Sequence, residues 1–313
     1  MDPKIKYFIY IGQGLLLVSL NATIVACVSV HTPLRAQKTY LLIGALALAD
    51  LTLGLGYLTA GVYRLLLILS EVDKYQRTSF ECLLTVHNVL FILGQPLSSL
   101  MLVCVSLDRL IFTYDTVRYL TYTRRYMLCL ISVFYSFTLL NALAATCVSY
   151  KQPRTETYDA ICMTSWAIGD VTFRSYYWLM ITLGGVVSVV LYSLVLCGSC
   201  CANQKVAPPV ERDRKQKRSM RKEREMVRTL AVSSGFTLVF FVLPNLVQVL
   251  ASYWATEQQY KEIGAWAAIL ANFNPMANLF LFVLRHRDIR EGVKSMFRFK
   301  AMPEITDLTA TVS

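Results

Sequence analysis

Charged side chains are scarce in this sequence: Asp, Glu, Lys and Arg make up 16% of its 313 residues, while 55% of the residues are hydrophobic. Water-soluble domains carry roughly 25% charged residues. The scarcity of charge argues against a water-soluble domain of ordinary composition and favours a protein that lies in a membrane.

Histidine is rarer still, with three copies at His31, His87 and His286. These residues have no metal-ligand spacing, and the sequence contains neither a nucleophile elbow nor a phosphate-binding loop. We therefore expect neither an enzyme nor a metal centre built from clustered protein ligands.

Long apolar runs are abundant, and seven of them exceed the ~20 residues that a helix needs to cross a bilayer. Five of the seven contain no Asp, Glu, Lys, Arg or His. The runs are residues 7–30, 40–70, 82–107, 126–150, 175–201, 229–256 and 263–284. The fold class that they predict is an all-α membrane protein, a bundle of seven transmembrane helices.

Basic residues gather on one side of this predicted bundle. The segments that start at His31, Asp108, Ala202 and Arg285 contain 22 of the 31 Lys and Arg residues, and the segments on the other side contain eight. Because basic loops remain in the cytoplasm, we predict an outside amino terminus and a cytoplasmic carboxyl terminus, in the plasma membrane. The basic segment 211–228 should extend the sixth helix and lie near anionic membrane lipids, and we expect no nucleic-acid partner.

An amphipathic segment, residues 288–299, follows the seventh run. Its two faces contain Ile289, Val293, Met296 and Phe297 on one side and Arg290, Lys294 and Arg298 on the other. This pattern predicts a short cytoplasmic helix that lies on the membrane surface. Residues 1–300 are then one helical domain, and residues 301–313 are a flexible tail.

Four polar residues fall at one depth of the predicted bundle: Asn21, Asp50, Ser98 and Asn274. Each lies ten or eleven residues from the cytoplasmic end of its helix, about 15 Å along the axis and about half the hydrocarbon thickness. A carboxylate is costly in lipid, so Asp50 should face the interior and share protons, water or a cation with the other three. Alternatively, Asn21 and Ser98 only form hydrogen bonds between helices.

Five short motifs occur in order along the predicted helices: SLNATIV around Asn21, LALADL around Asp50, DRL at 108–110, FFVLP ending at Pro244, and NPMAN from Asn274. Together they resemble the landmarks of rhodopsin-class G-protein-coupled receptors, and the chain is most similar to the nematode serpentine chemoreceptors of class SX. This resemblance implies a receptor that transmits the binding of an extracellular small molecule or peptide to a heterotrimeric G protein. Sensory cilia are an expected location for such a chemoreceptor.

The resemblance also implies an activation switch at the cytoplasmic end of the third helix. Arg109 matches the arginine that contacts the G protein after the sixth helix moves outward, and Asp108 restrains this arginine at rest. Tyr192 matches a partner tyrosine of the active state. The remaining landmarks lie in the sixth and seventh helices, at Pro244, Asn274 and Pro275. An arginine at this depth is also what extension of its side chain toward the membrane surface would give.

Asp50, Ser98 and Asn274 match the mid-membrane sodium and water site of the family. Leu270 and Ala271 are apolar where that site has further polar residues. Binding of Na⁺ at Asp50 is therefore a hypothesis, and a ligand response indifferent to sodium and to Asp50→Asn would argue against it.

Several positions depart from the family pattern. Asn278 replaces the tyrosine of the NPxxY motif, Val242 replaces an aromatic residue, and Gly184 stands where the fifth helix usually has proline. Arg224, flanked by Glu223 and Glu225, occupies a position where an acid often pairs with the third-helix arginine. Activation therefore uses different intramembrane contacts, or the chain is a receptor-like scaffold without signalling.

Cys82 and Cys162 are the only two of the nine cysteines on the predicted outer side, where thiols are oxidised. We predict a disulfide between them that holds the loop 151–174 over the ligand entrance. Cys82 lies 27 residues before Arg109, where the family has 25, and we expect a bulge or kink near Gln95 and Pro96 to accommodate the difference.

The ligand pocket is less defined by the sequence. Phe91 stands where amine receptors have an aspartate, and the run 263–284 has no lysine for retinal, so both of these ligand types are disfavoured. His87, Phe91 and Gln95 form one helical stripe and are candidate pocket residues. Arg64 either binds an acidic ligand or extends its side chain toward the membrane surface.

A transporter or a ligand-gated channel is the main alternative to a receptor. A transporter would show two related halves or interrupted helices around a midplane site. Here the strongest charge pattern lies at a single face, which favours the receptor.

Overall fold

The computed structural model describes residues 2–71, 75–115, 119, 121–153, 157–204, 232–285 and 287–298. The basic segment 211–228, which includes Arg224 and its flanking acids, lies outside the described residues. So do the tail 301–313 and His286.

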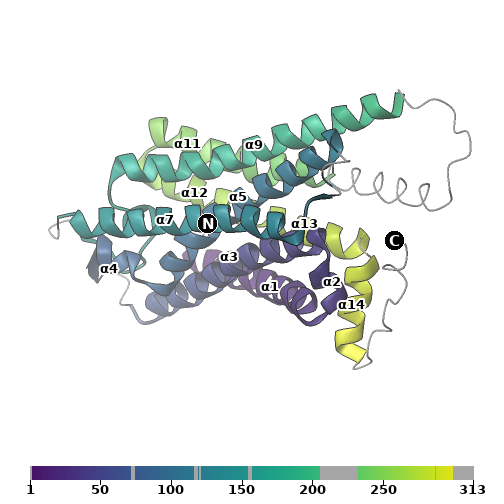
Figure 1. Cartoon of the computed structure of the whole chain (residues 1–313). Helices are drawn as coiled ribbons and strands as arrows, with labels where there is room; N and C mark the ends of the chain where they lie inside the picture. Colours follow the sequence, from purple (N-terminus) through teal and green to yellow (C-terminus); the bar gives the residue numbers. More distant parts are fainter. Residues whose placement is uncertain are drawn as a thin grey trace, which may run out of the picture.

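Long helices lie side by side along the bundle (Figure 1). The first five are α1 (Pro3–Val30), α3 (Lys38–Leu69), α5 (Val86–Tyr114), α7 (Arg124–Lys151) and α9 (Val171–Gln204). Together with Val232–Ala251 they make six helices, within the described residues, that are long and apolar enough to cross a membrane. The predicted fold class, an all-α membrane bundle, is confirmed.

The sixth helix contains a π-helical turn, η1 (Thr237–Val242), followed directly by α11 (Leu243–Trp254). At the end of this turn the Leu243 N–H donates to the carbonyl of Leu238, five residues earlier. Pro244 has no N–H, and its ring would crowd the carbonyl four residues before it, so the wider turn accommodates the proline. Phe241 and Val242, the last two residues of this turn, are both buried.

The seventh predicted run forms two helices, α12 (Glu257–Ala271) and α13 (Phe273–Arg285), which meet at Asn272. Thr256 begins α12 with a capping box, in which Gln259 is the reciprocal partner. Pro275 cannot donate a hydrogen bond to the carbonyl of Ala271, and this loss favours a break just before the proline. The single helix expected over residues 263–284 is therefore interrupted.

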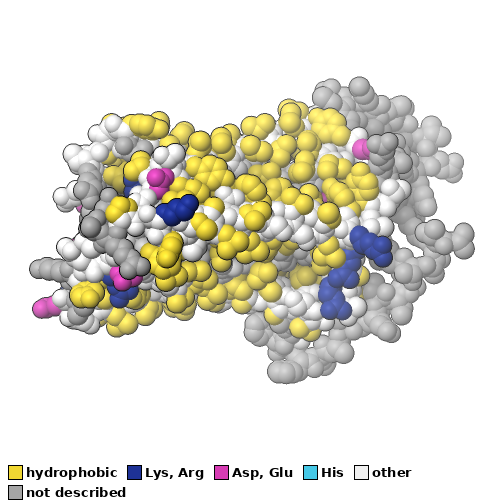
Figure 2. All heavy atoms as spheres, turned by 60° about the vertical axis from the view of Figure 1, so that its left-hand side comes forward, with side chains coloured by type: hydrophobic (Ala, Val, Ile, Leu, Met, Phe, Trp, Pro, Cys, Tyr) yellow, Lys and Arg dark blue, Asp and Glu magenta, His cyan; other side chains and the backbone are white. Residues whose placement is uncertain are grey.

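The face of the bundle that Figure 2 shows is apolar across its middle, and charged side chains lie toward its two ends. Inside, α3, α5 and α9 share an apolar core. This core includes Leu42, Leu46, Ala49, Leu97, Met101, Leu102, Val105 and Tyr192. The wide apolar surface is what a protein surrounded by lipid requires.

Short elements cover one end of the bundle. We call it the cavity end, after the cavity that is described in the next subsection. They are α4 (Ser79–Leu83), α8 (Thr164–Ala167) and the antiparallel strands β1 (Gln76–Thr78) and β2 (Thr157–Asp159). No strand was predicted from the sequence. The Ser79 hydroxyl donates to the Trp166 carbonyl at 2.7 Å, which ties α4 to α8.

The third predicted helix is also divided at the cavity end. Cys82 belongs to α4, and Leu84 and Thr85 separate α4 from α5. Helix α5 continues through Pro96. Between Cys82 and Arg109 the α-helix is therefore interrupted at Leu84 and Thr85, and not at Gln95 and Pro96.

Helix α14 (Arg287–Arg298) crosses the other end of the bundle next to α1 and the short α2 (Thr32–Ala36), as Figure 1 shows. Ile289 is fully buried in a cluster with Cys27 and Leu34. The Tyr40 hydroxyl donates to the Asp288 carboxylate at 2.7 Å. Helix α14 is thus fixed to the bundle by apolar and polar contacts.

Helices α1 and α3 approach each other closely at glycine. A Cβ added at Gly14 would lie 2.5 Å from the backbone nitrogen of Leu58, whereas one added at Gly12 would meet nothing within 4 Å. We predict that Gly14→Ala lowers the free energy of unfolding by about 1–3 kcal/mol, because the two backbones must separate. Thermal unfolding in detergent measures this, with Gly12→Ala as the matched control. Equal midpoint temperatures of unfolding for Gly14→Ala and Gly12→Ala would contradict the observed packing.

Candidate functional site

A cavity of about 700 Å³ lies at the cavity end, between the helices and the covering segments. This volume is within the range of sites for small organic ligands. Phe91 and Gln95 of α5 line it, together with Tyr10 of α1, Tyr57 of α3 and Trp178 of α9. Aromatic side chains from four helices therefore converge on one space.

Gln95 is held in place by the neighbouring helix α9. The Tyr177 hydroxyl lies 3.1 Å from both the Gln95 Oε1 atom and the Phe91 carbonyl oxygen, and it donates to this pair. Tyr177 is 2% exposed. Because the side-chain oxygen of Gln95 faces Tyr177, its amide N–H groups can serve as hydrogen-bond donors elsewhere.

A disulfide joins Cys82 to Cys162, as predicted from the sequence. Asn88 donates to the carbonyls of both cysteines, at 2.8 Å and 3.0 Å. The Arg64 side chain donates to the carbonyls of Ile161 and Cys162, each at 3.0 Å. Arg64 therefore binds the covering loop instead of extending toward the membrane surface.

His87, the third residue of the predicted stripe, is not among the residues that line the cavity. It is 2% exposed, and its Nε2 atom lies 3.3 Å from the Cys162 carbonyl oxygen. The position of His87 under the covering loop reflects its place only one residue after the start of α5.

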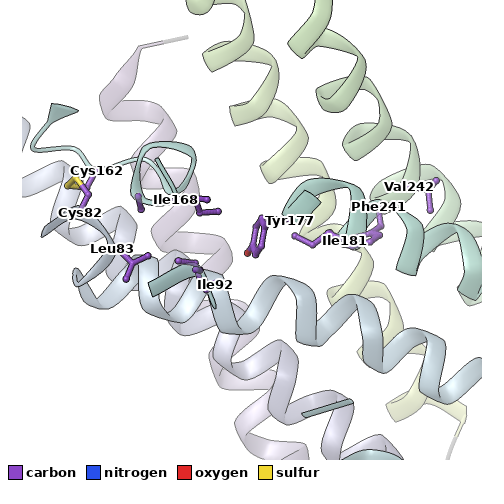
Figure 3. Packing of buried hydrophobic residues seen from close by; sticks show 11 residues of the cluster. Cys82, Leu83, Ile92, Cys162, Ile168, Tyr177, Ile181, Phe241 and Val242 are labelled. Atoms are coloured by element: carbon purple, nitrogen blue, oxygen red, sulfur yellow. A yellow bond between two sulfur atoms is a disulfide. The ribbon is translucent and has the colours of Figure 1, made fainter. Parts of the chain in front are cut away.

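An apolar cluster extends from this disulfide to the sixth helix (Figure 3). Ile168, Tyr177 and Ile181 lie between the disulfide and Phe241 in this cluster. The loop over the cavity and the π-helical turn are thus connected through packed side chains.

Asp50 is 3% exposed and accepts a hydrogen bond from the Ser98 hydroxyl at 2.5 Å. A separate cavity of about 10 Å³ lies beside it, lined by Asn21, Asp50 and Asn278 among others. This volume is about that of one water-sized probe. The Asn21 amide donates to the Leu17 carbonyl at 2.9 Å, and its Oδ1 atom has no partner within the described residues.

Asn274 faces the sixth helix and not Asp50. The Thr237 hydroxyl donates to Asn274 Oδ1 at 2.9 Å, and one helical turn away the Ser233 hydroxyl donates to Asn278 Oδ1 at 2.5 Å. All four side chains are buried. Asn274 is next to Pro275, so these bonds lie where the seventh helix is irregular.

Asp108 and Arg109 lie near the far end of α5, which we call the Arg109 end. Arg109 Nε is 3.6 Å from the Asp108 carboxylate, and Arg109 and Asp108 are 7% and 0% exposed. The Tyr119 hydroxyl donates to the same carboxylate at 3.0 Å. Burial and the Asp108 charge raise the pKa of Tyr119 above its usual value, so Tyr119 remains a hydrogen-bond donor.

The segment with Tyr119 is anchored by the start of α3. The Lys38 ammonium donates to the backbone carbonyls of Tyr119 and Tyr122. Tyr192 of α9 is 2% exposed and packs in the core that α3, α5 and α9 share. The structure thus brings Asp108 and Arg109 together with Tyr119, and it places Tyr192 in the core of the same bundle.

The model of the 7 transmembrane receptor (rhodopsin family) matches residues 20–282. The chain belongs to the rhodopsin family. No curated protein matches the chain significantly.

Members of the rhodopsin family are receptors and not enzymes, and the chain is accordingly a multi-pass membrane receptor of this family. The matched range includes Asn21, Asp50, Arg109, Pro244 and Asn274, one residue of each of the five motifs. The chemosensory class, the ligand, the G protein and the orientation remain predictions.

Sequence reasoning missed the contacts between the sixth and seventh helices. Ser233 and Thr237 are spaced by four residues, as are Asn274 and Asn278, so each pair lies on one helical face. This matching spacing of two hydroxyls and two amides was the available signal. Tyr119 was missed as well, because nothing in its local sequence marks it as a partner of Asp108.

Proposed function

We propose that this rhodopsin-family receptor is a chemoreceptor that transmits the binding of an extracellular small molecule to a heterotrimeric G protein. The observation that carries the proposal is the single helix α5, which contributes Phe91 and Gln95 to the cavity and Arg109 to the opposite end. Gln95 and Arg109 are 14 positions apart, about 21 Å along a helix. One rigid element thus joins a ligand-sized cavity to the candidate G-protein contact.

We infer that the cavity end is outside the cell and the Arg109 end is in the cytoplasm. The Cys82–Cys162 disulfide lies at the cavity end, and disulfides persist in oxidising compartments. The excess of basic loops lies at the other end of the predicted bundle. Both observations support an amino terminus outside the cell, in the plasma membrane, with sensory cilia as the expected site of a chemoreceptor.

Activation requires a second conformation that the ligand binds better than the first. In the conformation described here, Asp108 holds Arg109, while Ser233 and Thr237 bind the seventh helix. We propose that the ligand favours a state in which these contacts break, the sixth helix moves outward and Arg109 contacts the G protein. The apolar cluster from the disulfide to Phe241 supplies a packed connection between the two regions.

A ligand panel on cells that express the chain tests this function, with second-messenger production as the readout. The account predicts a ligand-dependent signal that disappears in Arg109→Ala at equal surface expression. An ion current or ligand uptake without a second-messenger signal would favour the channel or transporter. Ligand binding without any signal, across all classes of G protein, would favour the receptor-like scaffold.

Fewer of the predicted residues than expected lie beside Asp50 to support a sodium site. Asp50 and Ser98 are in contact, but Asn274 is not among the described residues that line the small cavity beside Asp50. We propose that Asn278 takes the place of Asn274 beside Asp50, because Asn278 and Asp50 line the same small cavity. The comparison of ligand affinity in sodium and in a large organic cation, for the parent chain and Asp50→Asn, tests this, and equal affinities throughout would exclude a sodium role.

A further inference from the structure

We propose that the cavity binds a small organic acid: an apolar body with a carboxylate-type anionic group that Lys6 and Arg64 hold. This inference rests on the proposed function, because it identifies the cavity with the ligand site and names the ligand class. Three independent features support it: the sign of the charges in the cavity, the burial of Arg64, and the apolar character of the remaining wall.

All the charged residues known to line the cavity are basic. Lys6 of α1, Arg64 of α3 and Arg174 of α9 face this space, and the described lining residues include no Asp or Glu. The ion pair between Asp108 and Arg109 lies at the opposite end of the bundle. Glu262 of α12 attracts Lys6 electrostatically but does not line the cavity, so the described lining carries net positive charge from three helices.

Arg64 is the strongest indication of an anionic ligand. It is 5% exposed, and its hydrogen bonds to the carbonyls of Ile161 and Cys162 satisfy donors without neutralising the charge. Among the described residues no carboxylate pairs with Arg64, and a buried guanidinium without a counter-ion is costly. Because Arg64 lines the cavity, the carboxylate of a ligand would supply the missing opposite charge and accept its remaining N–H groups.

Lys6 and Arg174 differ from Arg64 in how they are held. The Lys6 side chain is half-buried near the start of α1. Arg174 donates from Nη1 to the Ser165 carbonyl at 3.2 Å, which fixes it to the covering loop. Lys6 is thus the cation that can be removed with the least effect on the fold.

The other walls of the cavity favour an apolar and aromatic body for the ligand. Phe91, Trp178, Leu179, Val249 and Ala265 contribute to them. A volume of about 700 Å³ accommodates a small molecule but no folded partner. Apolar lining with a few convergent charged groups is the usual composition of a site for a small amphipathic ligand.

The test measures binding without a G protein, so it does not depend on signalling. The full chain in lipid nanodiscs is titrated with indole-3-acetate, 3-phenylpropanoate and decanoate, and with the primary amide of each. We expect at least one acid to bind with a Kd below about 1 mM and its amide to bind at least about tenfold more weakly. Lys6→Gln and Arg64→Gln should each weaken acid binding by about tenfold or more, and Arg64→Lys should restore part of it.

Arg124→Gln is the matched control, because Arg124 is exposed at the first position of α7 and does not line the cavity. It should bind acids as the parent does. If Arg64→Gln does not fold, Lys6→Gln decides, since no hydrogen bond of its ammonium within the described residues is lost. Equal binding of acids and amides, unchanged acid binding in Lys6→Gln, or no acid binding below about 1 mM would overturn the inference.

Failure of this inference and failure of the proposed function give different results. An acid that binds but never stimulates nucleotide exchange counts against G-protein signalling and leaves the ligand class standing. A neutral or cationic ligand that stimulates exchange through Arg109 supports signalling and overturns the anionic ligand class.

Discussion

Loss of the Cys82–Cys162 disulfide, by Cys82→Ser, is expected to abolish ligand binding and to lower the free energy of unfolding by about 2–5 kcal/mol. The bond closes a loop between residues 80 positions apart, so its removal frees the covering segments from the bundle. Thermal unfolding and binding of a radiolabelled ligand by the purified chain measure the two effects.

The large effect on binding follows from what the disulfide positions. Arg64 and Asn88 both donate to the Cys162 carbonyl, and Asn88 also donates to that of Cys82. Without the covalent bond, these donors lose their fixed acceptors, and the wall of the cavity that includes Arg64 is no longer held.

Cys147→Ser is the matched control for this experiment, because Cys147 is an exposed free thiol on α7. It should unfold and bind ligand as the parent chain does. A reducing agent should lower the stability and ligand binding of the parent chain as Cys82→Ser does. It should not change the stability or binding of Cys82→Ser itself. Full ligand affinity in Cys82→Ser would show that the covering loop does not shape the cavity.

Arg109→Ala is expected to reduce ligand-stimulated nucleotide exchange on the G protein by about 10- to 100-fold, the equivalent of one hydrogen-bonded charged contact. Ligand affinity in the absence of G protein should stay within about threefold of the parent value, since Arg109 lies about 21 Å from Gln95. A purified receptor with defined G-protein subunits and labelled nucleotide measures the exchange rate.

Asp108→Asn should have the opposite effect, raising exchange in the absence of ligand. The substitution removes the charge that faces Arg109 at 3.6 Å, while the amide oxygen can still accept the Tyr119 hydrogen bond. Arg124→Ala, a loss of an exposed arginine at the same end of the bundle, should change neither rate and serves as the control. An undiminished response in Arg109→Ala would contradict the proposed contact and favour the channel or transporter.

The helical bundle was predictable from the sequence because apolar run length is a strong and local signal. The irregular turns in the sixth and seventh helices could not be predicted as well from the sequence. Pro244 and Pro275 indicate where regular hydrogen bonding fails, but they do not specify a π-helical turn in one helix and a break at Asn272 in the other. Which of these forms results depends on packing against neighbouring helices.

Sequence spacing predicted which residues share one level of the bundle, but it did not predict which of them contact one another. Spacing along each helix placed Asp50, Ser98 and Asn274 at one level, and the structure joins Asp50 to Ser98. Asn274 turns to Thr237, because the rotation of each helix about its axis, which spacing alone does not give, determines the direction of a side chain. Arg64 is a similar case, since its partners are backbone carbonyls of a loop that lies 97 positions away.

The central claim is that one bundle couples the cavity to the Arg109 end, and this coupling must be reciprocal. The most direct measurement is the affinity of the tightest-binding ligand for the receptor in nanodiscs, with and without a nucleotide-free G protein. The account predicts that the G protein tightens ligand binding by about fivefold or more and that added GTP reverses the change. Identical ligand affinities with and without a G protein that is itself bound to the receptor would contradict the account.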